Sequence, residues 1–279
     1  IIDEIAESLI AQGMIIEQYY PESGPGHQEI TIKYTDALQA ADYQIAFRET
    51  VRAVANQYGL RASFLPKIFL DRAGSGCHLH LSLWKNEKNL IPGRKEPHGL
   101  SKTASSFIAG LLNHLPALMA ITTPSTNSYR RIRPNYWSGA FRCWGVDNRE
   151  AAVRVITDPE SKEYKQFEFK TIDATANPYL AMGAVIAAGL DGIRKKMDPG
   201  KPVDLDPGNL LEEELKALNI DPLPRNLGTA LELLTGDRVL LGALGNELSQ
   251  AYLAVRKAEW ELMKSYDLAD EVDLLLEKY

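Results

Sequence analysis

The sequence predicts an α+β fold, in which a curved antiparallel sheet is flanked by helices and followed by a helical C-terminal region. Three patterns lead to this prediction. Short segments that alternate apolar and polar residues, as half-buried strands do, recur along the first two thirds of the chain. Longer segments between them repeat apolar residues at helical spacing, and from Asp204 onward the chain reads as helical almost throughout.

The helices have recognisable starts and ends. The opening segment IIDEIAESLIAQG reads as an amphipathic helix that ends at Gly13. Asp36 and Ser101 each precede a long helical segment and are placed to cap it. Asn177, followed by Pro178, starts a further helix rich in small residues, which allow close packing. The segment LGNELSQAYLAVRKAEWELMKSY predicts a long helix near the C-terminus.

The segment GSGCHLHLSLW, residues 74–84, reads as a strand with two different faces. Alternation places His78, His80 and Ser82 on one face. The other face is apolar and predicts core; it carries Cys77, Leu79, Leu81 and Leu83. Two imidazoles and a hydroxyl are expensive to bury without partners, so the polar face either lines a site or faces water. This segment alone leaves both readings open.

Other strands are expected at 29–34, 151–156 and 166–173. The segment from Thr123 to Arg149 has little periodicity and is rich in arginines and aromatic residues. Long irregular segments in compact domains are usually functional or disordered, and the aromatic content argues against disorder. We therefore expect this segment to contribute to a site. His114, in the second long helix, is expected to be packed or at the surface rather than a ligand.

Composition excludes several classes of protein. The chain has 279 residues, 45% of them hydrophobic and 24% charged, which is an ordinary globular balance. A net charge of −6 without a basic run argues against a nucleic-acid partner. No apolar run approaches the length of a membrane span, so no membrane partner is expected. The two distant cysteines predict reduced thiols in the cytoplasm.

The polar residues on the predicted strand faces suggest metal chemistry. Three carboxylates and an imidazole on one sheet face, from Glu22, Glu29, Glu168 and His78, would repel one another or lack solvation without cations. Hard divalent ions such as Mg²⁺ or Mn²⁺ favour such oxygen-rich sets. Arginines suit phosphate or carboxylate groups; the candidates are Arg131, Arg149 and Arg154. Together these groups favour phosphoryl transfer from a nucleotide, although the P-loop and protein-kinase motifs are absent.

Five motifs in order resemble a known family. ESGPGHQEI, GSGCHLHLSL, NSYRRIRP, WGVDNREAAVRV and FEFKTIDATANPYL are similar to segments of the glutamine synthetase catalytic domain. The resemblance covers nearly the whole chain, and we take 1–279 as one such domain. It implies ATP-dependent ligation: glutamate is activated as γ-glutamyl phosphate, and an amine then displaces phosphate. It also implies Mg²⁺ or Mn²⁺ ions that hold ATP.

The resemblance also implies roles for individual residues. The implied metal ligands are Glu22 and Glu29 for the ion nearer the substrate, and His78 and Glu168 for the ion on the ATP phosphates. The implied nucleotide contacts are His80, Ser82, Arg149 and Arg154. Gly74 and Arg131 are the implied glutamate contacts, and Arg131 and Arg149 are the implied catalytic arginines. Because Arg149 and Arg154 are an odd number of residues apart, one of them should precede the strand or lie at a bulge.

Four positions depart from the family pattern. His27 replaces a glutamine, Ala73 an asparagine and Lys170 an arginine near the substrate carboxylate. Trp137 stands where ammonia-using members carry a glutamate, and the loop from 132 to 148 contains no glutamate. A missing general base costs on the order of 10²–10⁴-fold in rate, so an organic amine is favoured over ammonium. Trp137 is then either a wall for that amine or simple loop packing.

The family also carries an N-terminal β-grasp domain and assembles into rings in which neighbouring subunits complete each site. We find no such domain here, and expect this chain to be part of a longer protein that forms a ring-type homo-oligomer. Two other readings stay open: a true glutamine synthetase that uses ammonium, and a non-catalytic relative with a structural or regulatory role. A guanidino kinase would also use charged residues on a sheet, but the glycine-histidine and Asn-Arg motifs fit that family poorly.

Overall fold

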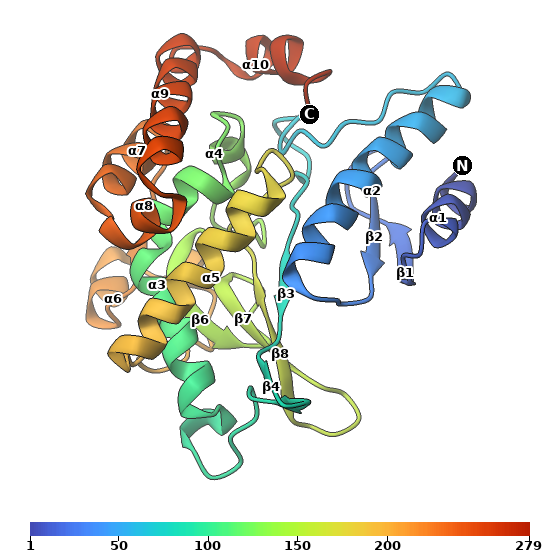
Figure 1. Cartoon of the computed structure of the whole chain (residues 1–279). Coiled ribbons are helices and arrows are strands. Elements are labelled where there is room, and N and C mark those ends of the chain that lie inside the picture. The colour runs from blue at the N-terminus through green and yellow to red at the C-terminus, as the bar shows by residue number, and fades with distance from the viewer.

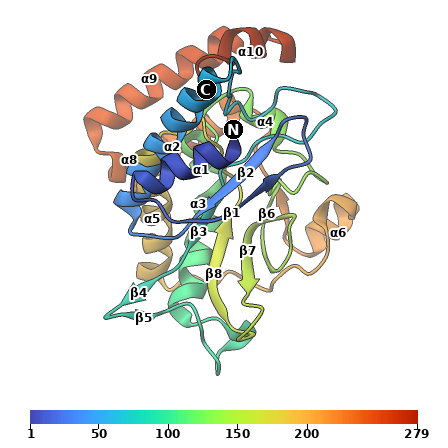
Figure 2. The ribbon, with the colours of Figure 1, turned by 90° about the vertical axis from the view of Figure 1, so that its right-hand side faces the viewer.

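The computed structural model describes all residues, 1–279, and has the predicted α+β architecture (Figure 1). A five-stranded sheet lies in the middle of the molecule. The helices α3 (Lys102–Thr122) and α5 (Pro178–Lys195) lie on one side of the sheet. The hairpin formed by β1 (Ile16–Pro21) and β2 (Gln28–Ile32) lies on the other side of this sheet, as both Figure 1 and Figure 2 show.

The other helices and the strands have the following bounds, each kind given in chain order. The other helices are α1 (Ile2–Ala11), α2 (Ala37–Gln57), α4 (Ser128–Arg131), α6 (Glu212–Ala217), α7 (Leu227–Gly236), α8 (Arg238–Leu244), α9 (Asn246–Met263) and α10 (Leu268–Leu275). The strands are β1 (Ile16–Pro21), β2 (Gln28–Ile32), β3 (Leu79–Leu81), β4 (Trp84–Lys85), β5 (Lys88–Asn89), β6 (Phe141–Val146), β7 (Ala151–Thr157), β8 (Tyr164–Phe169) and β9 (Asp221–Pro222). The C-terminal region is helical apart from β9.

The central sheet has the order β3-β8-β7-β6-β9. The pairs β3/β8, β8/β7 and β6/β9 are antiparallel, but β6 and β7 are parallel. The expectation of an antiparallel sheet is therefore wrong for this one pair. The strand β6 was not anticipated, because it lies inside the segment without periodicity and is buried at most of its positions.

The predicted helix starts are confirmed by side-chain caps. Asp36 accepts hydrogen bonds from two backbone N–H groups at the start of α2, and Ser101 accepts one at the start of α3. Asn177 does the same for α5, with Pro178 in the first turn. Each cap satisfies donors that the helix itself leaves unpaired, worth about 1 kcal/mol. Local sequence therefore determines where these helices begin.

The core lies between α3, α5 and the sheet. Phe167 and Phe169 of β8 are fully buried and belong to the main hydrophobic cluster. The two helices approach closely at Gly110 and Gly192, where an added Cβ would lie 2.2 and 2.0 Å from a backbone carbonyl of the other helix. This close packing fixes the helical layer against the sheet.

The helix α3 is long and apolar enough, by length and composition, to cross a membrane, contrary to the expectation from the sequence. However, 72% of its most apolar window is buried inside the protein. A helix that is hydrophobic all round and covered by other elements is typical of a core helix. The burial of α3 accounts for its composition without a membrane.

Candidate active site

Strand register brings three of the predicted residues together. His80 of β3 lies directly opposite Glu168 of β8, and Glu168 lies directly opposite Arg154 of β7. Directly opposed residues present their side chains on the same face of a sheet. The three side chains therefore form a row across β3, β8 and β7.

Glu168 is the centre of a charged cluster. Its side chain is only 4% exposed, and its Oε1 atom lies 3.0 Å from His78 Nδ1, 3.9 Å from His80 Nε2 and 3.5 Å from Lys170 Nζ. The Oε2 atom lies 2.7 Å from Arg154 Nε. Although burial opposes ionisation, the neighbouring cationic and imidazole groups hold the pKa of Glu168 well below its usual range. Glu168 is thus an ionised carboxylate in a largely buried setting.

His78 lies one residue before β3 and shares the polar side with His80, as the alternation predicted. Burial is the largest cause that lowers the pKa of His78, to about 4, so the imidazole is neutral near pH 7. Its Nε2 atom is buried and has no hydrogen-bond partner. Buried polar atoms without partners are rare in folded proteins, and a neutral ring nitrogen in this state is able to ligate a metal. On the other side of the strand, burial raises the pKa of the Cys77 thiol to about 11, consistent with an inert thiol.

Arg131 lies against the glycine segment before β3. An added Cβ at Gly74 would be 2.9 Å from Arg131 Cγ and 2.3 Å from the carbonyl of Pro66. At Gly76 it would be 2.6 Å from His78 Nε2. The glycines are therefore required for the backbone, the guanidinium and the imidazole to pack together.

The Arg131 guanidinium is itself buried. It donates to the Ile172 carbonyl at 2.8 Å, whereas its Nε has no partner. Burial lowers the pKa of Arg131, and the carboxylate of Asp173 exerts the largest opposing effect. A buried arginine without an ion pair is suited to bind a carboxylate ligand.

The β1–β2 hairpin holds the other two predicted carboxylates. Glu29 lies opposite Tyr20, and Glu22 follows β1 directly. Burial raises the pKa of Glu29, and the carboxylates of Glu22 and Glu168 raise it further. His27 in the turn lies 3.2 Å from the hydroxyl of Ser75, so the hairpin contacts the glycine segment next to Arg131.

These residues fit a divalent cation by the chemistry of the donor set. Mutually repelling carboxylates at Glu22 and Glu29 need a positive charge, and His78 Nε2 is free to donate a lone pair. No three His, Cys, Asp or Glu side chains of the chain converge closely enough to hold a metal ion. The ligand set Glu22, Glu29, His78 and Glu168 therefore stays a prediction.

Trp137 and Arg149 form a separate pair near the irregular segment. The Arg149 guanidinium lies 5.5 Å from the centre of the Trp137 ring, which is 56% exposed as a residue. Arg149 precedes β7, whereas Arg154 lies within it, which confirms that one of the two arginines had to lie outside the regular strand. Ser82 lies just beyond β3, where its hydroxyl accepts a hydrogen bond from the Trp84 indole at 2.8 Å.

Sequence reasoning missed several charged residues that the fold buries, and two of them, Glu150 and Lys67, lie beside the irregular segment. Glu150 is 4% exposed, and its Oε1 atom accepts the backbone N–H of Trp137 at 2.9 Å. Lys67 is 1% exposed, donates to the Arg72 carbonyl and lies 4.7 Å from the ring centre of Tyr136. The only local signal for Glu150 is its position directly after Arg149; nothing in the pattern shows that it is buried.

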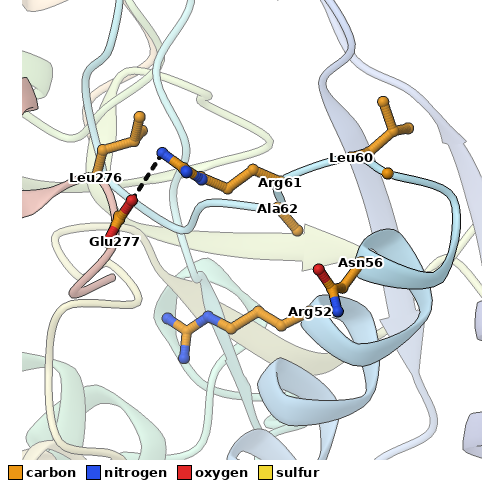
Figure 3. A pocket seen from close by; sticks show the side chains of 8 residues that line it. Arg52, Asn56, Leu60, Arg61, Ala62, Leu276 and Glu277 are labelled. Atoms are coloured by element: carbon orange, nitrogen blue, oxygen red, sulfur yellow. Dashed lines mark ion pairs between the residues drawn. The ribbon is translucent and has the colours of Figure 1, made fainter.

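A cavity of about 500 Å³ lies elsewhere, between the end of α2 and the C-terminus (Figure 3). It is lined by residues that include Arg52, Asn56 and Arg61, and an Arg61–Glu277 ion pair of 2.9 Å crosses its edge. None of the predicted site residues lines this cavity. It is therefore separate from the cluster around Glu168.

Comparison with known proteins identifies the family. The family model of the glutamine synthetase catalytic domain matches residues 1–274. The chain belongs to this family. It is 40% identical to type-1 glutamine synthetase 1 of Dictyostelium discoideum over 100% of this chain and 55% of that protein. It is also 40% identical to the gamma-glutamylpolyamine synthetase of Streptomyces coelicolor, over 92% of this chain and 55% of that protein.

Solved structures agree with the sequence comparison. A structure of GmaS in complex with ADP superposes with a TM-score of 0.85 and 36% identity, covering 99% of this chain and 63% of that one. A structure of a glutamine synthase homologue gives a TM-score of 0.85 at 34% identity over 99% of this chain. The chain spans between about half and two thirds of the length of these relatives. The predicted α+β fold with helices flanking the sheet is confirmed by these matches.

Proposed function

We propose that this chain is the catalytic domain of an ATP-dependent ligase that joins glutamate to an amine through γ-glutamyl phosphate, with an organic amine preferred to ammonium. The family membership supports the ligase chemistry, because relatives with names of both kinds, glutamine synthetase and gamma-glutamylpolyamine synthetase, are equally similar to it. The choice between the two nitrogen donors rests on the residues near Trp137.

The residue roles follow the clusters described above. Glu22, Glu29, His78 and Glu168 would hold Mg²⁺ or Mn²⁺, which supply charge neutralisation for the transferred phosphoryl group. His80, Ser82, Arg149 and Arg154 contact ATP. Gly74, Arg131 and Lys170 contact glutamate, and Trp137 forms a wall of the amine pocket.

The reaction proceeds in two balanced steps. A γ-carboxylate oxygen of glutamate bonds to the γ-phosphorus of ATP, and ADP leaves. The nitrogen of the amine then bonds to the γ-carbon, the bond from that carbon to the phosphate oxygen breaks, and the nitrogen loses a proton. Arg131 and Arg149 orient the acid and stabilise the charge that develops on phosphate.

The observation that carries the amine preference is the exposed indole of Trp137 beside Arg149. A flat apolar surface binds the alkyl part of an amine, and its π face attracts a cation with about 0.5–2 kcal/mol. Ammonium has no alkyl part and gains only the second effect. An amine with a carbon chain therefore has the larger gain from this surface.

The remaining proposals concern the complete protein. We expect it to be a cytoplasmic, ring-type homo-oligomer that has an N-terminal domain in addition to residues 1–279. The ammonium-using glutamine synthetase is the second candidate, since several relatives carry that name. A non-catalytic role is the third, and it has less support because the candidate ligands and arginines are all chemically competent.

The deciding experiment measures phosphate release from Mg-ATP by the complete protein with glutamate, using ammonium and a panel of primary amines. We expect release with particular organic amines and little with ammonium. Release with ammonium alone would identify a glutamine synthetase. Absence of release with every donor, while ATP still binds, would favour the non-catalytic role.

A further inference from the structure

Glu150 is a buried carboxylate whose hydrogen bonds are incomplete. It lies one residue before β7 and is only 4% exposed. Its Oε1 atom accepts the N–H of Trp137 at 2.9 Å, whereas its Oε2 atom is buried and has no partner. No lysine or arginine forms an ion pair with it. Leaving a buried acceptor unpaired costs about 1–3 kcal/mol, and more when the group is charged, so this arrangement needs an explanation.

The charges around Glu150 leave it short of a cation. Burial is the largest cause that raises the pKa of Glu150, and the carboxylate of Asp206 adds to this effect. The hydrogen bond from the Trp137 N–H, the charge of Lys170 and the backbone N–H of Asn135 oppose it only in part. Lys170 is already engaged 3.5 Å from Glu168. The nearby Arg149 guanidinium lies over the Trp137 ring instead. The site around Glu150 therefore favours an added positive charge.

Glu150 rests on a fixed support, whereas the segment that covers it is exposed. Asn148 accepts the Glu150 N–H at 3.0 Å and donates to the carbonyls of Val203 and Leu205 at 2.7 and 2.9 Å. In the covering segment, residues 135–137, Trp137 is 56% exposed. The Glu150 carboxylate is thus supported by Asn148 and covered by the exposed residues 135–137.

The covering segment is held in an unfavourable backbone conformation. Asn135 and Trp137 have φ angles of +63° and +52°. Asparagine tolerates such an angle, but for a bulky residue such as Trp137 it costs roughly 1–2 kcal/mol. The hydrogen bond from Trp137 to Glu150 is one of the contacts that keep this conformation. A ligand that competes for Glu150 would therefore release strain as it displaces the segment.

From this geometry we infer that Glu150 and Trp137 together form the amine subsite, in which the Glu150 carboxylate binds the positively charged nitrogen of a primary alkylamine and the Trp137 indole packs on its carbon chain. The amine reaches Oε2 when residues 135–137 lift. An alkylammonium supplies both missing elements, an N–H donor and a positive charge. This inference rests on the proposed ligase function and names the group that selects its nitrogen donor.

The test compares two nucleophiles of different charge in the complete protein. A primary alkylamine is a cation at pH 7, whereas hydroxylamine is neutral. Glu150→Gln keeps an oxygen that accepts the Trp137 N–H but removes the charge. We expect the ratio of kcat/KM for the alkylamine to that for hydroxylamine to fall about 10- to 100-fold, mainly through KM for the alkylamine.

Two further variants separate charge from structure. Asp147→Asn is the matched control, because Asp147 is a nearby acid that bonds to Thr157 and does not contact Trp137; its ratio should equal that of the wild type. Glu150→Ala removes the acceptor as well, and circular dichroism checks that each variant is folded. A Glu150→Gln ratio within twofold of the wild type, with a changed ratio only in Glu150→Ala, would overturn the inference and leave Glu150 as a structural support.

Failure of the ligase proposal has a different signature. If the wild-type protein forms no product from glutamate and ATP with any alkylamine or with hydroxylamine, the proposed function is wrong. The amine subsite at Glu150 is then wrong as well. If the wild-type protein forms product and Glu150→Gln keeps the wild-type ratio, only the subsite is wrong.

Discussion

Two histidines of this chain lie beside carboxylates, His114 buried and His78 half-buried, and their surroundings differ. His114 of α3 has both ring nitrogens occupied, with Nδ1 2.5 Å from Asp237 and Nε2 3.1 Å from Asp191. His78 has one nitrogen 3.0 Å from Glu168, and the other has no partner. The first arrangement is self-sufficient, which is typical of a structural role. The second is incomplete, which is typical of a site that binds something.

The charges around the two histidines show the same difference. Burial lowers the pKa of His78 to about 4, whereas for His114 the two aspartates outweigh burial and raise its pKa. The His114 cluster therefore balances its own charge and joins α3, α5 and the start of α8. The expectation that His114 is packed rather than a ligand is consistent with this arrangement. Changes at the two clusters should accordingly affect different properties.

The largest expected effect is on activity at the incomplete cluster. Glu168→Gln removes the charge that pairs with Arg154 and Lys170, and we expect ATP turnover by the complete protein to fall by about 10²–10³-fold or more. The measurement is phosphate release with glutamate and the best amine. His78→Ala should behave in the same way. Undiminished turnover in both variants would refute the assignment of this cluster to the active site.

The next effect is on stability at the self-sufficient cluster. His114→Ala leaves the Asp191 and Asp237 carboxylates, whose side chains are 8% and 12% exposed, without the imidazole between them, and we expect the free energy of unfolding to fall by about 3–5 kcal/mol. Urea unfolding followed by circular dichroism measures this change. The folded fraction of the variant should keep the wild-type KM for ATP. A large change in that KM would contradict the division between a structural and a functional cluster.

A smaller effect is expected at Trp137. Trp137→Glu removes the apolar surface beside Arg149 and adds a carboxylate. We expect kcat/KM for ammonium to rise and kcat/KM for the preferred alkylamine to fall by about 2- to 30-fold, the range that a lost cation–π contact implies. Steady-state kinetics with both donors provides the measurement. Unchanged preference would mean that Trp137 only packs against the loop.

The smallest effect is a pH dependence of stability at the His114 cluster. Because the pKa of His114 is raised in the folded state above 6.5, its contribution is complete below pH 6.5 and disappears as the pH rises through the folded pKa. Asp191 and Asp237 have lowered pKa values, so their contributions disappear only in acid. Lys195, 2.8 Å from Asp191, keeps part of the Asp191 contribution at high pH.

The check is a comparison of urea unfolding for the wild type and His114→Ala at several pH values. The difference in unfolding free energy between the two proteins should be largest in weakly acidic solution and should shrink towards alkaline pH. A difference that stays constant from pH 5 to pH 9 would mean that His114 does not gain a proton on folding.

The sequence by itself determined the local features of this protein. Capping side chains such as Asp36 and Ser101 bond to the next few backbone N–H groups, so their effect is readable from neighbouring residues. The alternation that places Phe167 and Phe169 in the core and Glu168 on the polar face is also local. The ordered motifs were sufficient to predict the family and the fold.

Only the tertiary structure decided which charges meet. The row formed by His80, Glu168 and Arg154 depends on strand register, and the contacts of His114 join residues 77 and 123 positions apart. The parallel pairing of β6 and β7 and the burial of Glu150 under Trp137 likewise depend on segments folding back on one another. Burial and long-range pairing set the cost of an unpaired charge, and neither is encoded in the spacing of residues along a single segment.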